Sequence, residues 1–142
     1  MKKLLWCICL TFLVTGYTYA REPLAVTVDV LAKTGSSWDG KPLPGYGEGA
    51  PEVTILRIAI PPGVRLPLHK HPVINAGVLL QGILTVVTKE GSILHLQAGD
   101  SIVEVVETWH YGKNEGSETA EIIVFYAGIQ GEPITIKAES AE

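Results

Sequence analysis

The stretch GVRLPLHKHPVINAGVLLQG, residues 63–82, carries the most information about the fold of this chain. Its central feature is His69-Lys70-His71, in which two histidines flank one lysine. Side chains alternate between the two faces of an extended strand, so both imidazoles point one way and Lys70 points the other. Pro72 favours an extended backbone at His71, which maintains this geometry. The stretch therefore predicts a β-strand that can offer two imidazoles to one ion.

A third histidine, His110, lies in a second informative stretch, GDSIVEVVETWHYGKN, residues 99–114. It is preceded by Trp109 and followed by Tyr111, and we place it on a later strand. Neutral imidazole binds Fe, Zn, Mn, Ni and Cu, so the residue types do not select the metal. A lone His-x-His is a weak indication of a metal site, because most single histidines on strands are packed or face solvent. The spacing of the surrounding residues makes the indication stronger.

That spacing resembles the two sequence motifs of the cupin superfamily. The residues at the spacing of the first motif are Gly63, His69, Lys70, His71, Asn75 and Gly82. The residues at the spacing of the second motif are Gly99, Val105, Glu107, His110 and Asn114. The resemblance implies an all-β, single-domain cupin fold, which is a double-stranded β-helix or jelly-roll barrel. It also implies that His69, His71 and His110 hold one divalent metal ion.

Three positions depart from the cupin pattern. Relatives usually carry Glu where this chain has Asn75, Pro where it has Val105, and Gly where it has Glu107. Asn75 matters most, because an amide oxygen is neutral and a poorer ligand than a carboxylate. The resemblance then implies a three-histidine site, as in the thiol dioxygenase relatives, with Asn75 as a weak ligand or one step removed from the ion. The alternative is a barrel that has lost its metal and keeps the histidines as a polar patch.

Glu104 and Glu107 are the other carboxylates close to His110 in the sequence. On one unbroken strand Glu104 would share the face of His110 and Glu107 would face away. We nevertheless expect both to be solvent-exposed charges rather than ligands, because acidic side chains are rarely buried. His95 alternates with Leu94 and Leu96, so we place it on the outer face.

The rest of the chain from Leu24 onward indicates short strands broken by turns, as in an all-β sandwich or barrel. The predicted strands are Ala25–Leu31, Val53–Ile60, Ala76–Leu80, Ile83–Thr88, Ser92–Leu96, Ser101–Val106, Ile122–Ala127 and Ile134–Lys137. The turn signals between them are Pro61-Pro62-Gly63, Glu90-Gly91 and Ala98-Gly99-Asp100. Alternation also directs Arg57 outward, between Leu56 and Ile58.

A long segment rich in Gly, Pro and Ser, residues 34–52, is predicted to be an ordered loop. Trp38 and Tyr46 within it could stack on a ligand at the mouth of the barrel. Alternatively, and with more weight, they anchor the loop to the barrel or to a partner subunit.

The first twenty residues have the order of charged, apolar and small residues that is typical of a secretory signal peptide. Lys2 and Lys3 precede the apolar run from Leu4 to Val14, and Ala20 precedes the expected cleavage point. The run is shorter than the roughly 20 residues of a membrane span, although an uncleaved anchor is the alternative. We therefore predict a signal peptide at residues 1–20 and one cupin domain at residues 21–142, with the mature protein periplasmic or secreted.

The 142-residue chain carries 11 basic and 15 acidic residues, and loss of Lys2 and Lys3 makes it more acidic. This charge argues against nucleic acid and anionic membranes as partners. Both cysteines lie in the predicted signal peptide, so no thiol would remain after cleavage. Apolar residues on both faces of several strands, together with the family resemblance, predict a homodimer.

Three functions are compatible with this sequence. The first is an enzyme of the oxygenase or isomerase type that acts on a small molecule through a three-histidine divalent metal site. The second is a non-catalytic cupin that binds a small ligand or a metal, and the third is a structural cupin. No nucleophile or general base stands out in the sequence near the histidines, so the catalytic residues are not assigned.

Overall fold

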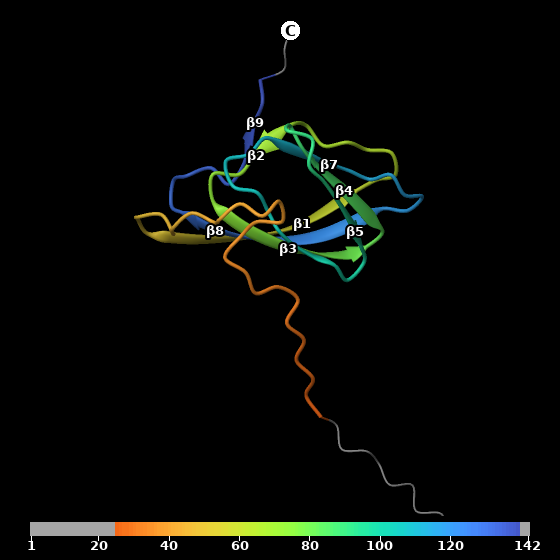
Figure 1. Cartoon of the computed structure of the whole chain (residues 1–142), viewed down its shortest axis with the longest axis horizontal. Coiled ribbons are helices and arrows are strands. Elements are labelled where there is room, and N and C mark those ends of the chain that lie inside the picture. The colour runs from red at the N-terminus through yellow and green to blue at the C-terminus, as the bar shows by residue number, and fades with distance from the viewer. Residues whose placement is uncertain (1–24, 140–142) are drawn as a thin grey trace, which may run out of the picture.

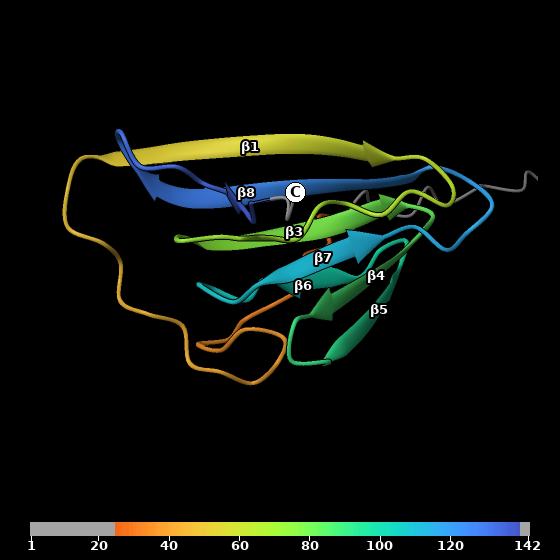
Figure 2. The same cartoon turned by 90° about the horizontal axis from the view of Figure 1, so that it is seen from above.

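The computed structural model describes residues 25–139, so the predicted signal peptide, residues 1–20, lies outside the described residues and is not tested. The described chain forms strands and turns, and it contains no helix of a length and hydropathy that could cross a membrane. The all-β prediction is therefore confirmed. Two antiparallel sheets face each other and form the jelly roll (Figures 1 and 2).

The first sheet has four strands in the order β1-β8-β3-β6. These strands are β1 (Pro51–Ile60), β8 (Ala120–Ile129), β3 (Ile74–Gln81) and β6 (Ser101–Val103). The second sheet has five strands in the order β5-β4-β7-β2-β9. These are β5 (Ile93–Gln97), β4 (Ile83–Thr88), β7 (His110–Lys113), β2 (His69–Lys70) and β9 (Ile136–Lys137).

The hydrophobic core lies between the sheets, and strand alternation explains which residues enter it. In β8 every second side chain is buried, from Ala120 to Tyr126, while the residues between them face outward. Leu84 and Val86 of β4 and Leu96 of β5 complete the facing layer. The second sheet therefore supplies the wall opposite β8, and the polar site described below lies at one end of this core.

Two glycines at predicted corners have the left-handed backbone that such turns require. Gly91 (φ 98°) closes the hairpin between β4 and β5, and Gly99 (φ 95°) turns the chain between β5 and β6. Glu107 is the one non-glycine residue with positive φ (54°) among those the structure describes. It occupies the position where the cupin motif usually has glycine, so the turn is kept although the residue has changed.

The predicted strand Ala25–Leu31 is wrong. This segment is extended and leads away from the two sheets (Figure 1, orange), with Val26 at 91% and Val28 at 82% exposure. Its alternating valines satisfy the local preference for a strand, but no described strand pairs with it, and Ser101 Oγ donates to the carbonyl oxygen of Leu31 (2.7 Å) at its end. The predicted strand Ser101–Val106 is also too long, since β6 ends at Val103.

Candidate metal centre

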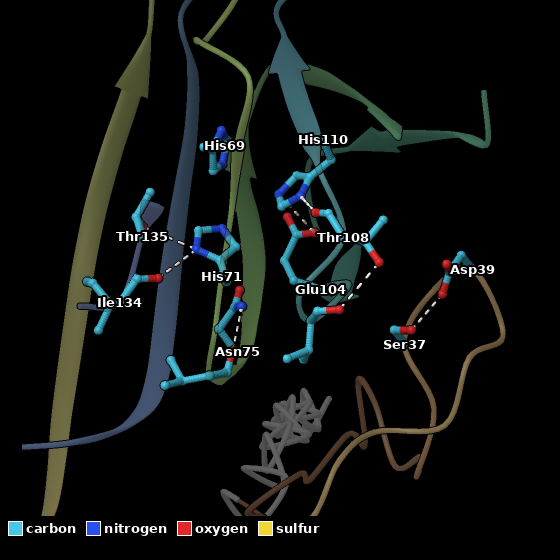
Figure 3. A network of polar contacts seen from close by, with 12 residues as sticks. Ser37, Asp39, His69, His71, Asn75, Glu104, Thr108, His110, Ile134 and Thr135 are labelled. Atoms are coloured by element: carbon cyan, nitrogen blue, oxygen red, sulfur yellow. Dashed lines mark hydrogen bonds and ion pairs between the residues drawn. The ribbon is translucent and has the colours of Figure 1, made fainter. Parts of the chain in front are cut away.

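The three histidines predicted as ligands come together at one end of the barrel (Figure 3). His69 of β2 and His110 of β7 are directly opposite each other in the antiparallel pairing of these strands, and their ring centroids are 4.5 Å apart. His71 lies 5.0 Å from His69 and 5.1 Å from His110 by the same measure. Lys70 points to the other side, where it pairs with Glu107. The prediction of two imidazoles on one face and a lysine on the other is confirmed.

Each imidazole is held by the same kind of hydrogen bond. The Nδ1 atoms of His69, His71 and His110 lie 2.8 Å from the backbone carbonyl oxygens of Pro67, Ile134 and Thr108. A carbonyl oxygen only accepts, so each Nδ1 carries the proton and donates it. In the neutral ring the lone pair is then on Nε2. The ligand nitrogens of the three rings lie within 4.8 Å of one another, so they could hold a metal ion.

The surroundings keep these histidines neutral. Burial lowers the pKa of His69 and His110, and it lowers the pKa of His71 to about 4. The positive charge that His110 would carry adds to the effect on both other rings. Metal binding requires an unprotonated imidazole, so burial prepares all three rings for it at neutral pH.

Glu104 is part of this site, and the expectation that it is a solvent-exposed charge was wrong. The chain leaves β6 at Val103, and Glu104 then turns into the barrel, where its Oε2 lies 3.8 Å from Nε2 of His110. Burial raises the pKa of the Glu104 carboxyl to about 7, although the His69 charge opposes this. Glu107, in contrast, is exposed as expected and pairs with Lys70 on the outside.

Asn75 also faces the histidines, from the middle of the first sheet. Its Nδ2 donates to the carbonyl oxygen of Val73 (3.3 Å), which leaves Oδ1 directed into the barrel. Three buried polar atoms of the site have no hydrogen-bond partner among the described residues, and these are Asn75 Oδ1, Glu104 Oε2 and His110 Nε2. With Glu104 ionised, all three are acceptors. Buried acceptors without a donor are costly, and a bound cation could satisfy all of them together.

The space between these groups is a cavity of about 50 Å³. The three histidines, Asn75 and Glu104 form its polar side, and core residues such as Leu84 and Val124 form its apolar side. A wider opening of about 260 Å³ borders His69 and His71 and leads outward. Its walls are Leu56, Ile58, Leu66, Pro67, Tyr126, Thr135 and Lys137.

Three residues of this opening were missed by the sequence analysis. Tyr126 of β8 packs its ring against His71 at 5.3 Å, and burial raises the pKa of its hydroxyl to about 12. The alternation of β8 is a signal that could have placed it inside. Thr135 and Lys137 belong to the C-terminal segment. The short apolar pattern of that segment does not indicate that it lies beside the histidines.

The other residues that the sequence analysis discussed, His95, Arg57 and Asn114, lie away from the cavity. His95 and Arg57 face outward as predicted, and Arg57 pairs with Glu121 of β8. Asn114 is buried and fixes the turn after β7, since its Nδ2 donates to the carbonyl oxygens of Ile60 and Glu118. These residues support the barrel rather than the candidate site.

The loop of residues 34–52 is anchored mainly through Trp38. Its backbone N–H donates to the carbonyl oxygen of Val103 (2.9 Å), and its side chain packs against the core. The indole N–H lowers the pKa of the Glu104 carboxyl, and Trp38 Nε1 is buried with no hydrogen-bond partner among the described residues. Tyr46 is 82% exposed. The anchoring interpretation therefore applies to Trp38.

Residues 56–126 match the cupin domain family, so the chain belongs to the cupins. A cupin-like protein from Thermotoga maritima superposes with a TM-score of 0.55 at 16% identity, over 61% of this chain and 64% of that one. The DMSP lyase DddQ of Ruegeria pomeroyi gives a TM-score of 0.55 at 17% identity, over 72% of this chain and 49% of that one.

Oxalate decarboxylase of Lactobacillus farciminis, in complex with formate, gives a TM-score of 0.52 at 24% identity, over 60% of this chain and 26% of that one. The alignments span less than two thirds of each of these solved chains. At these identities the likeness shows a shared fold. None of the curated proteins matches the sequence.

Proposed function

We propose that this cupin binds one divalent metal ion through His69, His71 and His110 and acts there on a small, oxygen-bearing molecule. The observation that carries the proposal is the set of three Nδ1–H donors, each bound to a backbone carbonyl oxygen. Metal-binding histidines are held in this way, because the bond fixes the ring and leaves Nε2 free. A hydrogen-bonded polar patch would instead pair the rings with one another.

The donor set fits such an ion. Three neutral imidazoles bind Fe, Zn, Mn, Ni or Cu. The buried oxygen of Asn75 is either a weak further ligand of the ion or orients a bound water or substrate. When bound, the ion would polarise an oxygen-bearing substrate or, as iron, take part in dioxygen chemistry. The protein's own contribution is to exclude water with apolar walls and to hold the imidazoles unprotonated.

The opening beside the histidines supports a small and preferably anionic substrate. Leu56, Ile58 and Leu66 line it with apolar surface, and Lys137 brings a positive charge whose effect reaches His69. A carboxylate or enolate could extend from Lys137 towards the histidines. Tyr126 and Thr135 lie on the same wall and offer hydroxyl groups for orientation.

A non-catalytic role as a metal- or ligand-binding cupin is the second candidate. The observation that favours it is the small size of the inner cavity, about 50 Å³, which suits an ion and a few waters better than a substrate. In this case the opening would serve only for entry of the ion.

Metal analysis of the protein purified from its native compartment separates the candidates. It should be followed by oxygen-consumption and product assays with a panel of thiols, enols and diketones. Metal with turnover supports the enzyme, and metal without turnover supports the binding protein. The absence of bound metal after purification and reconstitution would contradict both.

We further propose that the chain is exported and forms a homodimer. The outer face of the first sheet supports the dimer, since Ile55 and Phe125 are opposite each other in β1 and β8 and are 64% and 42% exposed. A second copy would cover this apolar face. Intact mass of the exported protein should begin at Arg21, and light scattering at tens of micromolar should give the mass of a dimer rather than a monomer.

A further inference from the structure

We infer that Glu104 is the fourth protein ligand of the proposed metal, so that the carboxylate missing at Asn75 is supplied from the neighbouring strand. This inference rests on the proposed three-histidine site and extends it. It assigns a ligand set of three imidazoles and one carboxylate to a chain whose motif lacks the usual glutamate.

The backbone places Glu104 beside Asn75, the position where cupins usually have glutamate. Ala76 of β3 pairs with Val103 of β6, and the next step along β6 is a hydrogen bond from the backbone N–H of Glu104 to the carbonyl oxygen of Asn75 (3.0 Å). Glu104 is therefore the cross-strand neighbour of Asn75. Neighbouring residues on paired strands can point into the same space, so a carboxylate here serves the same cavity as one at position 75 would.

The unpartnered atoms indicate what Glu104 faces. Its Oε2 is buried without a hydrogen bond and lies 3.8 Å from Nε2 of His110, which is too far for a hydrogen bond between them. Nε2 of His110 and Oδ1 of Asn75 are unpartnered as well, and both residues are 1% exposed. Metal–ligand bonds of about 2.0–2.2 Å allow one ion to bridge two atoms at this separation.

Trp38 is held next to this part of the chain, since its backbone N–H donates to the carbonyl oxygen of Val103, the residue before Glu104 (2.9 Å). Its buried Nε1 has no hydrogen-bond partner among the described residues, and the indole N–H lowers the pKa of the Glu104 carboxyl. Carboxylate ligands of metals are themselves held by hydrogen bonds from neighbouring groups, and the indole N–H is suited to this role. The loop of residues 34–52 thus contributes a positioning residue to the site, although none of its side chains is expected to touch the ion.

The test is Zn²⁺ titration calorimetry on metal-stripped protein, with Glu107→Gln as the matched control. Glu104→Gln keeps the size of the side chain and removes its charge, and we expect it to weaken Zn²⁺ binding about 10–100-fold. Glu107→Gln makes the same chemical change three residues away, on the outer surface, and should leave the affinity unchanged. Visible absorption of the Co²⁺-loaded protein gives a second readout, since loss of a carboxylate ligand changes the ligand-field bands.

A double variant keeps the test decisive if Glu104→Gln perturbs the barrel. Glu104→Gln combined with Asn75→Glu returns the carboxylate to the usual cupin position, and it should recover most of the lost affinity. Equal affinities for wild type, Glu104→Gln and Glu107→Gln, together with loss of binding in His110→Ala, would overturn this inference and leave the three-histidine site standing. No Zn²⁺ binding by the wild type would overturn both.

Discussion

Two histidine-containing clusters of this barrel use similar residues in opposite ways. On the outer side of the second sheet, His95 is 3.1 Å from the hydroxyl of the buried Thr85, which donates to Glu115 (2.8 Å), and Glu115 pairs with Lys113 (2.7 Å). Donors and acceptors alternate along this chain of contacts. In the cavity, acceptor atoms face one another, and they belong to His69, His71, His110, Asn75 and Glu104. Three of them, Asn75 Oδ1, Glu104 Oε2 and His110 Nε2, have no hydrogen-bond partner among the described residues.

The comparison shows that residue type alone does not distinguish a metal site from a surface network. What distinguishes them is the balance of donors and acceptors. The outer cluster is complete without any further group, whereas the inner one has an excess of lone pairs in a buried space. A cation removes that excess, and the following experiments test whether the two clusters differ in this respect.

The largest difference is expected on removing one imidazole from each cluster. His110→Ala should weaken Zn²⁺ binding at least about 1000-fold, or about 4 kcal/mol, because with two imidazoles water fills most of the coordination positions of the ion. His95→Ala should leave the affinity unchanged. Calorimetry on metal-stripped protein measures both, and equal affinities for the two variants would show that the inner histidines are not ligands.

The next largest effect is the pH dependence of stability in the metal-free protein. His71 has a pKa of about 4 when folded against 6.5 normally, so the unfolded chain binds more protons between these values and stability falls as the pH falls through them. Glu104 acts in the opposite direction, because its pKa rises from 4.5 to about 7 on folding and its contribution is lost as the pH rises. Each group contributes on the order of 3 kcal/mol.

Glu104→Gln should therefore steepen the gain in stability between pH 4.5 and 6.5, because the opposing group is gone. Thermal melting of metal-free protein across this range measures the effect. Glu107→Gln is the control and should give a curve parallel to that of the wild type. Parallel curves for all three proteins would mean that Glu104 does not titrate together with the histidines.

A smaller effect is expected from adding a carboxylate at the usual cupin position. Asn75→Glu introduces an anionic oxygen next to the buried Oδ1 position and should tighten Zn²⁺ binding about 10–100-fold. Competition with a chelator of known affinity measures the gain in the wild-type background. An unchanged affinity would indicate that position 75 does not reach the ion or that Glu104 already fills the carboxylate position.

The smallest effect concerns the outer cluster. Thr85→Val removes the hydroxyl that joins His95 to Glu115, and it should lower the free energy of unfolding by about 1 kcal/mol. Urea unfolding measures this loss. Zn²⁺ affinity should stay the same, and a change in affinity would show that the two clusters are coupled through β4.

Much of this architecture could be predicted from local patterns. Strand alternation placed His69 and His71 on one face, and the turn signals at Gly91 and Gly99 marked the corners that the structure shows. These features depend on the residues next to them. The motif spacing added His110, whose cross-strand pairing with His69 no local pattern determines.

Glu104 and Ala25–Leu31 were mispredicted because their environments are set by distant segments. Glu104 is buried because its backbone is bonded to Asn75 on the inward face of the first sheet, and Trp38 of a remote loop is bonded to the residue before it. The valines of residues 25–31 lack a partner strand, which no local preference can provide. Tertiary context therefore decided both, as it does wherever burial rather than periodicity determines a residue's role.

The pairing of His69 with His110 has a consequence for the lifetime of the folded protein. An ion bound to these residues would join β2 to β7, and both strands belong to the sheet that also receives the last strand, β9. Such an ion would hold these strands together, and free metal at 1000 times its dissociation constant would add about 4 kcal/mol to the free energy of unfolding. Resistance to proteases would then depend on the supply of metal around the protein, and a chelator would shorten its survival.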